Sequence, residues 1–141
     1  YDNFLGFPNP LPKLKKVKKG KLGAYAGDPN LIEYIIKFFN FKNIKIINDD
    51  ILNLKKHKKK FKKISFIYID CDVYEPVTLI LNELVDKLSI GGIIAFDEAN
   101  KNKSSGEARA LNDFFIKNKK NFKKFVLKNE YQPDVYLIKI R

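Results

Sequence analysis

Two apolar segments, each ending in acidic residues, flank an amphipathic pattern in the middle of the chain. Residues 64–69 are nearly all apolar, as in a strand covered on both faces, and acids follow in residues 70–72. Residues 93–96 repeat this pattern and lead into the acids of residues 97–98. Between them, apolar side chains recur at helical spacing over residues 76–88. This strand, helix, strand order predicts two parallel strands whose acidic ends emerge at one edge of a sheet.

The remaining segments carry further signals of secondary structure. Asp28-Pro29 pairs a good N-cap with a proline at the first helical position, which predicts a helix over residues 29–40. A β-branched run predicts a strand over residues 44–47. The lysine-rich residues 55–63 are expected to form a solvated, charged connector. The C-terminal part is expected to contain a helix from residue 106 and two antiparallel strands, over residues 122–127 and 135–140.

Length and composition are typical of one soluble domain. With 141 residues and 45% hydrophobic side chains, the chain is expected to form a single core over residues 24–141, preceded by a Pro-, Gly- and Lys-rich loop or lid over residues 1–23. No stretch approaches the roughly 20 apolar residues of a membrane span, and no signal peptide is visible. A cytoplasmic protein is therefore expected. Because the chain lacks methionine and opens at Tyr1 within a loop-like stretch, we interpret it as a fragment.

The net charge of +12 raises the alternative of a nucleic-acid-binding module. Residues 13–21 and 55–63 carry the lysine runs that would contact phosphates. Such runs are more often solvated faces, and the aromatic side chains here fall mostly at core spacing instead of forming stacking platforms. Nucleic-acid binding is therefore the less favoured interpretation.

Acidic side chains are predicted to gather where the two parallel strands end. Ligands of open α/β sheets bind beyond the carboxyl ends of the strands, and Asp70, Asp72, Asp97 and Glu98 follow those ends. Carboxylates that converge repel one another, and a hard divalent cation or a cationic substrate relieves the repulsion. The alternative is that each acid only caps a helix or a loop. Two clusters at adjacent strand ends favour a binding site.

Several motifs together resemble the macrocin O-methyltransferase (TylF-type) family, in the order in which that family carries them. The motifs are Ile69-Asp70-Cys71-Asp72-Val73-Tyr74-Glu75, Leu88-Ser89-Ile90-Gly91-Gly92, Phe96-Asp97-Glu98 and Gly106-Glu107-Ala108-Arg109-Ala110, preceded by the aspartate, aromatic, Gly, Pro segment of residues 1–8.

The resemblance implies a class I methyltransferase that uses S-adenosylmethionine. The implied fold is α/β, a Rossmann-like three-layer sandwich with sheet order 3-2-1-4-5-7-6, here incomplete because strand 1 and most of strand 2 lie upstream of Tyr1. The implied activity is O-methylation of a hydroxyl of a sugar or another small molecule with the help of Mg²⁺. A homo-oligomer is compatible with this family. The alternative is the same fold acting on a different acceptor without metal.

Site residues follow from the match to the family's motifs. Asp70, Asp97 and Glu98 would be the metal ligands, and a cation held there would orient the acceptor hydroxyl and lower its pKa. Asp2 would lie near the donor's ribose and Asp50 near its adenine, with Asp70 also on the donor's side.

The roles of several further residues stay open at this stage. Tyr74 would line the substrate pocket, or else pack with its hydroxyl in water. Cys71 is expected to be a small packed residue, and Glu107 a first-turn acid that the helix dipole favours. No catalytic base is assigned, because the single histidine, His57, lies inside a lysine run.

Two departures from the family pattern bear on donor binding. The Gly-rich donor loop would lie before Tyr1, and Asp49 stands where the family has a glycine. With strand 1 absent, strand 4 would lack its partner, so residues 1–141 alone are expected to be unstable or inactive.

Overall fold

The computed structural model describes residues 1–6, 26–100, 105–128 and 132–141, which fall into two compact units, Tyr1–Ile51 and Leu52–Arg141. Of the loop or lid expected over residues 1–23, only the first six residues lie within the described part. In the described part of the chain, no helix is both long and apolar enough to cross a membrane.

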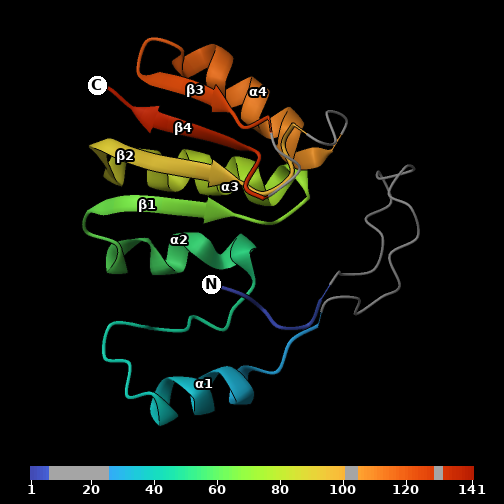
Figure 1. Cartoon of the computed structure of the whole chain (residues 1–141), viewed down its shortest axis with the longest axis vertical. Coiled ribbons are helices and arrows are strands. Elements are labelled where there is room, and N and C mark those ends of the chain that lie inside the picture. The colour runs from blue at the N-terminus through green and yellow to red at the C-terminus, as the bar shows by residue number, and fades with distance from the viewer. Residues whose placement is uncertain (7–25, 101–104, 129–131) are drawn as a thin grey trace. The chain divides into compact units, whose positions relative to one another are not determined.

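The second unit is built on a four-stranded sheet in the order β1-β2-β4-β3 (Figure 1). β1 (Ile64–Ile69) pairs in parallel with β2 (Leu88–Phe96), and β2 pairs antiparallel with β4 (Val135–Lys139). β3 (Phe122–Val126) lies antiparallel to β4 at the far edge. The parallel crossover, the C-terminal antiparallel pair and the predicted order of strands 4-5-7-6 are all confirmed.

β2 is longer than the sequence pattern indicates. The strand predicted over residues 93–96 instead begins at Leu88 and runs through Gly91 and Gly92. Gly91 has a φ of 79°, and the β1–β2 register shifts between Ile64 and Phe66. The glycines therefore sit at an irregularity inside the strand. Sequence patterns mark such residues as breakers because they do not show the partner strand that continues past them.

Two helices cover one face of this sheet (Figure 1). α3 (Tyr74–Leu84) begins before Pro76 and continues into the 3-10 turn η3 (Val85–Lys87). α4 (Gly106–Asn118) begins after Ser105, whose side chain accepts a hydrogen bond from the Ala108 N–H. Their inward side chains pack on the strands to form the core of the unit, which includes Val77, Ile80, Leu81, Leu84, Ile94, Phe96, Ala108, Leu111, Phe114 and Leu137.

The lysine-rich segment before β1 is helical, which corrects the expectation of a plain connector. It forms the 3-10 turn η1 (Ile51–Asn53), the short helix α2 (Leu54–His57) and the 3-10 turn η2 (Lys58–Lys60). Leu54 is 1% exposed, so burial of one apolar side chain fixes the segment against the unit. Lys55 and Lys58 both pair with the Glu83 carboxylate, at 3.7 and 3.0 Å.

The first unit contains α1 (Pro29–Phe38), close to the predicted helix over residues 29–40. The Asp28 carboxylate caps it by accepting the Asn30 N–H at 2.9 Å. The strand expected over residues 44–47 is not formed. Among the described residues, the pairing of this segment is limited to one isolated parallel bridge, between Asp2 and Asn48, and a strand needs a continuous partner.

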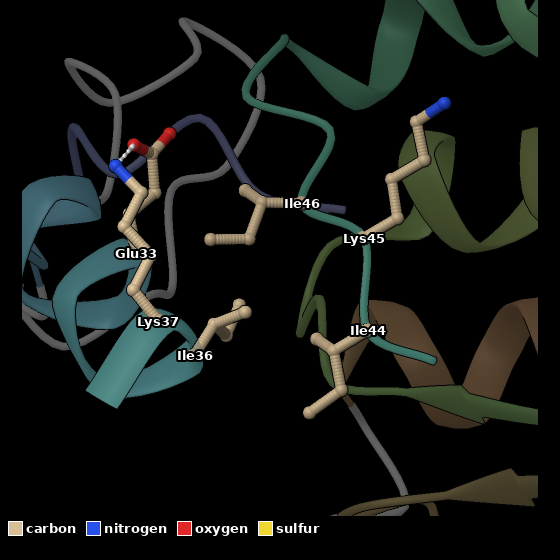
Figure 2. Close-up of a pocket in the computed structure, with 6 residues that line it drawn as sticks. All are labelled: Glu33, Ile36, Lys37, Ile44, Lys45 and Ile46. Atoms are coloured by element: carbon tan, nitrogen blue, oxygen red, sulfur yellow. Dashed lines mark ion pairs between the residues drawn. The ribbon is translucent and has the colours of Figure 1, made fainter. Parts of the chain in front are cut away.

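α1 has no buried residue, and large apolar side chains on it are exposed. A shallow pocket lies between α1 and residues 44–46, and in Figure 2 the side chains of Ile36 and Ile46 reach into the space between the two segments, while that of Lys45 is directed away from α1. At the rim, Glu33 and Lys37 form an exposed ion pair at 4.0 Å. Glu33 is the single acid among the residues that line this pocket, so the pocket differs in composition from the acidic segments that follow β1 and β2.

Candidate functional site

The strand register brings the two acidic segments of the second unit to the same edge of the sheet. Ile69 of β1 pairs with Phe96 of β2, and the Asp97 N–H donates to the Ile69 carbonyl at 3.0 Å. Asp70 and Asp97 therefore leave their strands at the same level. This confirms the predicted convergence of strand ends, which rests on the parallel crossover.

Asp72 shows that the acids lie within electrostatic reach of one another. Partial burial raises the pKa of Asp72, and the charges of Asp70, Glu98 and Asp97 raise it further. Its backbone has a φ of 55°, in the left-handed region that non-glycine residues seldom adopt. Strained residues of this kind concentrate at functional sites. The two acidic loops thus form one cluster, the strand-end cluster: Asp70, Asp72, Asp97 and Glu98.

Asp97 is the most buried member of the strand-end cluster, at 8% exposure. The Tyr68 hydroxyl, from β1, donates a hydrogen bond to Asp97 Oδ1. This bond, together with burial and the nearby charges of Asp97 and Asp70, raises the pKa of Tyr68 to about 12. Tyr68 is therefore protonated at neutral pH and acts as a donor that fixes the Asp97 carboxylate.

Glu98 is held from two sides. The Gln132 side-chain amide, in the segment before β4, donates to Glu98 Oε1 at 2.8 Å. The Glu98 backbone N–H donates to Glu107 Oε1 at 3.1 Å. Side chain and backbone of Glu98 are thus fixed by separate elements, which limits the positions that its carboxylate can take.

Glu107 is the residue of this region that sequence reasoning missed. It is fully buried, at 0% exposure. Burial raises the pKa of Glu107 to about 7, and the charges of Asp72 and Asp97 add to this rise. The hydrogen bond from the Glu98 N–H lowers the pKa and offsets part of the rise. The sequence analysis treated Glu107 only as an acid at a helix start. The signal was present, since Glu107, Leu111 and Phe114 share helical spacing and therefore one face of α4.

Tyr74, the candidate substrate-binding residue, is engaged with α4. Its hydroxyl donates to Asp113 Oδ2 at 2.8 Å, and the Arg109 guanidinium lies 5.2 Å from its ring centroid. This contact agrees with the packing alternative, and a role toward substrate stays a prediction. Cys71 is partly buried, and burial first, then the charges of Glu107 and Asp70, raise the pKa of its thiol to about 12.

The two candidate donor-binding residues of the first unit lie at neighbouring chain segments. The Asp2–Asn48 bridge is parallel, and the Asp49 N–H donates to the Asp2 carbonyl at 3.1 Å. Asp2 Oδ1 accepts the Phe4 N–H at 2.8 Å, and the Tyr1 hydroxyl donates to the Asp50 carbonyl at 3.0 Å. Asp2 thus lies in the parallel bridge, and Asp50 comes two residues after its partner, Asn48.

Asp70, Asp97 and Glu98 match magnesium in the kind of donor atom that they offer. In the part of the chain that the structure describes, however, no group of three or more His, Cys, Asp or Glu side chains is arranged to hold a metal ion. Asp97 and Glu98 instead accept hydrogen bonds from Tyr68 and Gln132. The described geometry is therefore one in which these carboxylates accept hydrogen bonds from neighbouring side chains.

The strand order, the parallel crossover and the acidic strand ends together define a Rossmann-like class I methyltransferase fold. Comparison with solved structures agrees. The calicheamicin methyltransferase CalS11 aligns with a TM-score of 0.67 at 19% identity, over 98% of this chain and 58% of its own length. The O-methyltransferase NovP aligns with a TM-score of 0.67 at 14% identity, over 99% of this chain and 58% of its own.

Two further structures extend this likeness. A second structure of CalS11, described as a TDP-rhamnose 3'-O-methyltransferase of calicheamicin biosynthesis, aligns with a TM-score of 0.63 at 18% identity, over 98% of this chain and 56% of its own. Fibrillarin from Aeropyrum pernix, with natively bound S-adenosyl-L-methionine, aligns with a TM-score of 0.52 at 14% identity, over 79% of this chain and 51% of its own.

These comparisons show the fold. The chain spans less than two thirds of the length of each of these proteins. Neither the models of known protein families nor the curated proteins include a match to this sequence. The TylF-type assignment therefore stays a prediction.

Proposed function

We propose that the protein containing this chain is an S-adenosylmethionine-dependent O-methyltransferase that methylates a hydroxyl of a sugar or a similar small molecule. The observation that carries the proposal is the strand-end cluster at the edge of the sheet where β1 and β2 end. The charges of Asp70, Asp97 and Glu98 raise the pKa of Asp72 there. The fold shared with CalS11 and NovP, both O-methyltransferases, supports it.

The chemistry suits this arrangement. Methyl transfer from a sulfonium is an in-line displacement in which the acceptor oxygen, the methyl carbon and the departing sulfur must be aligned in a site that excludes water. Carboxylates accept hydrogen bonds from hydroxyl groups, so the strand-end cluster can orient neighbouring hydroxyls of a sugar. The Tyr68 hydroxyl holds the Asp97 carboxylate in one position for this task. The proton acceptor for the attacking hydroxyl is not assigned.

The donor is proposed to contact the first unit. Asp2 lies in the parallel bridge to Asn48, and Asp50 follows two residues later; the family resemblance assigns these positions to the ribose and the adenine of the donor. Fibrillarin, which shares the fold, contains bound S-adenosyl-L-methionine. In this proposal, Asp2 and Asp50 of the first unit and Asp70 of the second contact the donor, and Asp97 and Glu98 of the second unit orient the acceptor.

Magnesium belongs to the proposal as an assisting ion. Asp70, Asp97 and Glu98 are the residues that would hold it, and it would supply charge that favours the alkoxide form of the acceptor. Titration calorimetry of the full-length protein with MgCl₂ tests this point. We expect saturable binding that an Asp97→Ala substitution weakens, and an unchanged affinity in this variant would remove the metal assignment.

A screen for methyl transfer tests the proposed function itself. The full-length protein would be incubated with S-adenosylmethionine and three kinds of hydroxyl acceptor: nucleotide-linked deoxysugars such as TDP-rhamnose, glycosylated small molecules, and catechols. Mass spectrometry would then identify products one methyl group heavier. We expect a sugar-bearing acceptor to be methylated. Methylation of none of these acceptors, by a protein that binds the donor, would contradict the proposal.

The nucleic-acid alternative is less well supported. Lys55 and Lys58, in the second of the two lysine runs, are paired with Glu83. A salt-sensitive shift of labelled RNA or DNA by the full-length protein would favour this alternative, and absence of a shift would remove it. A cytoplasmic location and a homo-oligomeric state stay predictions.

A further inference from the structure

One buried carboxyl group connects the two loops that carry the strand-end cluster. Glu107, in the first turn of α4, has no exposed surface. Its Oε1 accepts the backbone N–H of Glu98 at 3.1 Å, and its Oε2 has no hydrogen-bond partner among the described residues. Burial of a carboxyl group with one unpaired oxygen costs free energy, because desolvation disfavours its charged form. Such a residue is therefore a candidate for a specific role.

The same turn of α4 is packed tightly against the loop that follows β1. A Cβ added at Gly106 would lie 2.3 Å from the Tyr74 backbone nitrogen and 2.8 Å from the Asp72 carbonyl oxygen. The helix start can therefore approach the β1–α3 connection this closely because residue 106 is glycine. The charge of Glu107 also contributes to the raised pKa of the Cys71 thiol, which places the carboxyl group near the β1 loop as well.

The first turn of α4 thus contacts both loops. Gly106 packs on the backbone of the loop that carries Asp70 and Asp72, and Glu107 accepts a hydrogen bond from the loop that carries Asp97 and Glu98. The Ser105 cap, which accepts the Ala108 N–H at 3.0 Å, fixes this turn of α4 in place. The spacing between the two acidic loops therefore depends on the first turn of α4.

We infer that Glu107 is a positioning residue for the acceptor site: through the Glu98 N–H it holds the loop of Asp97 and Glu98 at a set distance from the loop of Asp70 and Asp72. The consequence for catalysis rests on the proposed function. The positioning itself does not, because it is a property of the second unit alone.

Two substitutions of matched size separate positioning from packing. Glu107→Gln keeps an oxygen that accepts the Glu98 N–H, whereas Glu107→Met fills the same volume without an acceptor. In the full-length protein, hydrogen exchange at the Glu98 amide, followed by NMR, is expected to accelerate about tenfold in Glu107→Met and to stay within about twofold of wild type in Glu107→Gln. Equal exchange rates in the two variants would overturn the inference.

The catalytic consequence is read with S-adenosylmethionine as donor and TDP-rhamnose as acceptor probe. We expect Glu107→Met to lower kcat about tenfold or more, with the KM for the donor unchanged, and Glu107→Gln to restore most of the loss. An equal loss in both variants, or a loss confined to the donor KM, would contradict the positioning role. If the wild-type protein transfers no methyl group to any acceptor, the proposed function fails, while the amide exchange at Glu98 still decides the inference.

Discussion

The acids of the strand-end cluster differ in what surrounds each side chain. Asp97 is buried and held by Tyr68, whereas Glu98 is held through its side chain by Gln132 and through its backbone by Glu107. Asp70 and Asp72 are exposed. A site with fixed acids beside solvent-facing ones suits a polar acceptor that must enter from water and then be aligned.

Cys71 should be unreactive in the folded protein. Burial and the neighbouring charges of Glu107 and Asp70 raise the pKa of its thiol to about 12, so almost no thiolate is present near neutral pH. At pH 8 we expect iodoacetamide to modify Cys71 about a hundredfold more slowly in the native protein than in urea. Mass spectrometry of the timed reaction measures this rate, and rapid modification of the native protein would show that the β1 loop is open.

Glu107 should make the stability of the protein depend on pH. Burial raises its pKa from 4.5 to about 7 in the folded state, so the folded state binds the proton more tightly than the unfolded state does. The free energy of unfolding should therefore fall as pH rises from about 4.5 to about 7, by up to about 3 kcal/mol, and level off above this range.

Urea unfolding at closely spaced pH values measures this dependence. In Glu107→Gln the fall between these pH values should be largely absent, because the amide does not titrate. Asp72, whose pKa is also raised, remains in both proteins and accounts for a residual slope of the same sign. An identical pH dependence in wild type and variant would contradict the burial of Glu107.

Among the elements, those with local signals were predicted well and those that depend on distant partners were not. α1, α3 and α4 follow from apolar spacing and from caps such as Asp28. The start of β2 at Leu88 and the missing strand over residues 44–47 depend on pairing with segments distant in the sequence, which periodicity does not reveal. α2 was not predicted, because a single buried side chain, Leu54, fixes that lysine-rich segment and gives no repeating apolar pattern.

Gly106 should be indispensable to the docking of α4. A Cβ at this position would lie 2.3 Å from the Tyr74 backbone nitrogen, so Gly106→Ala must displace either the helix start or the β1 loop. We expect a loss of about 1–3 kcal/mol in the free energy of unfolding, measured in urea. The matched control is Asn112→Ala on the exposed face of α4, expected to stay within about 0.5 kcal/mol of wild type. Equal stabilities of the two variants would contradict the tight contact.

For the whole molecule, the family resemblance of the sequence predicted the order of the four strands in the second unit, but the sequence did not predict the details of the site. The parallel crossover and the C-terminal antiparallel pair follow from the order of elements, and they place Asp70 and Asp97 at the same edge. The partners of the acids come from elements far along the chain, such as Gln132 before β4 and Glu107 in α4. These contacts depend on side-chain packing across elements, for which a single sequence carries little signal.

The two compact units carry different parts of the proposed reaction. Asp2 and Asp50, two of the candidate donor-binding residues, belong to Tyr1–Ile51, and the strand-end cluster, which includes the third candidate, Asp70, belongs to Leu52–Arg141. Donor binding and methyl transfer are separate steps of the proposed reaction. The proposed function can therefore be tested by separating the effect of a substitution on donor binding from its effect on transfer.

The rate of labelled methyl transfer in an Asp97→Asn variant tests the central claim most directly. The full-length protein would receive S-adenosylmethionine with a labelled methyl group and the acceptor identified in the screen. Asp86→Asn, at an exposed position beyond the far end of α3, is the control. We predict that Asp97→Asn lowers kcat about a hundredfold with donor affinity unchanged, while Asp86→Asn matches wild type. Transfer by Asp97→Asn at the wild-type rate would contradict the assignment of the strand-end cluster to the acceptor site.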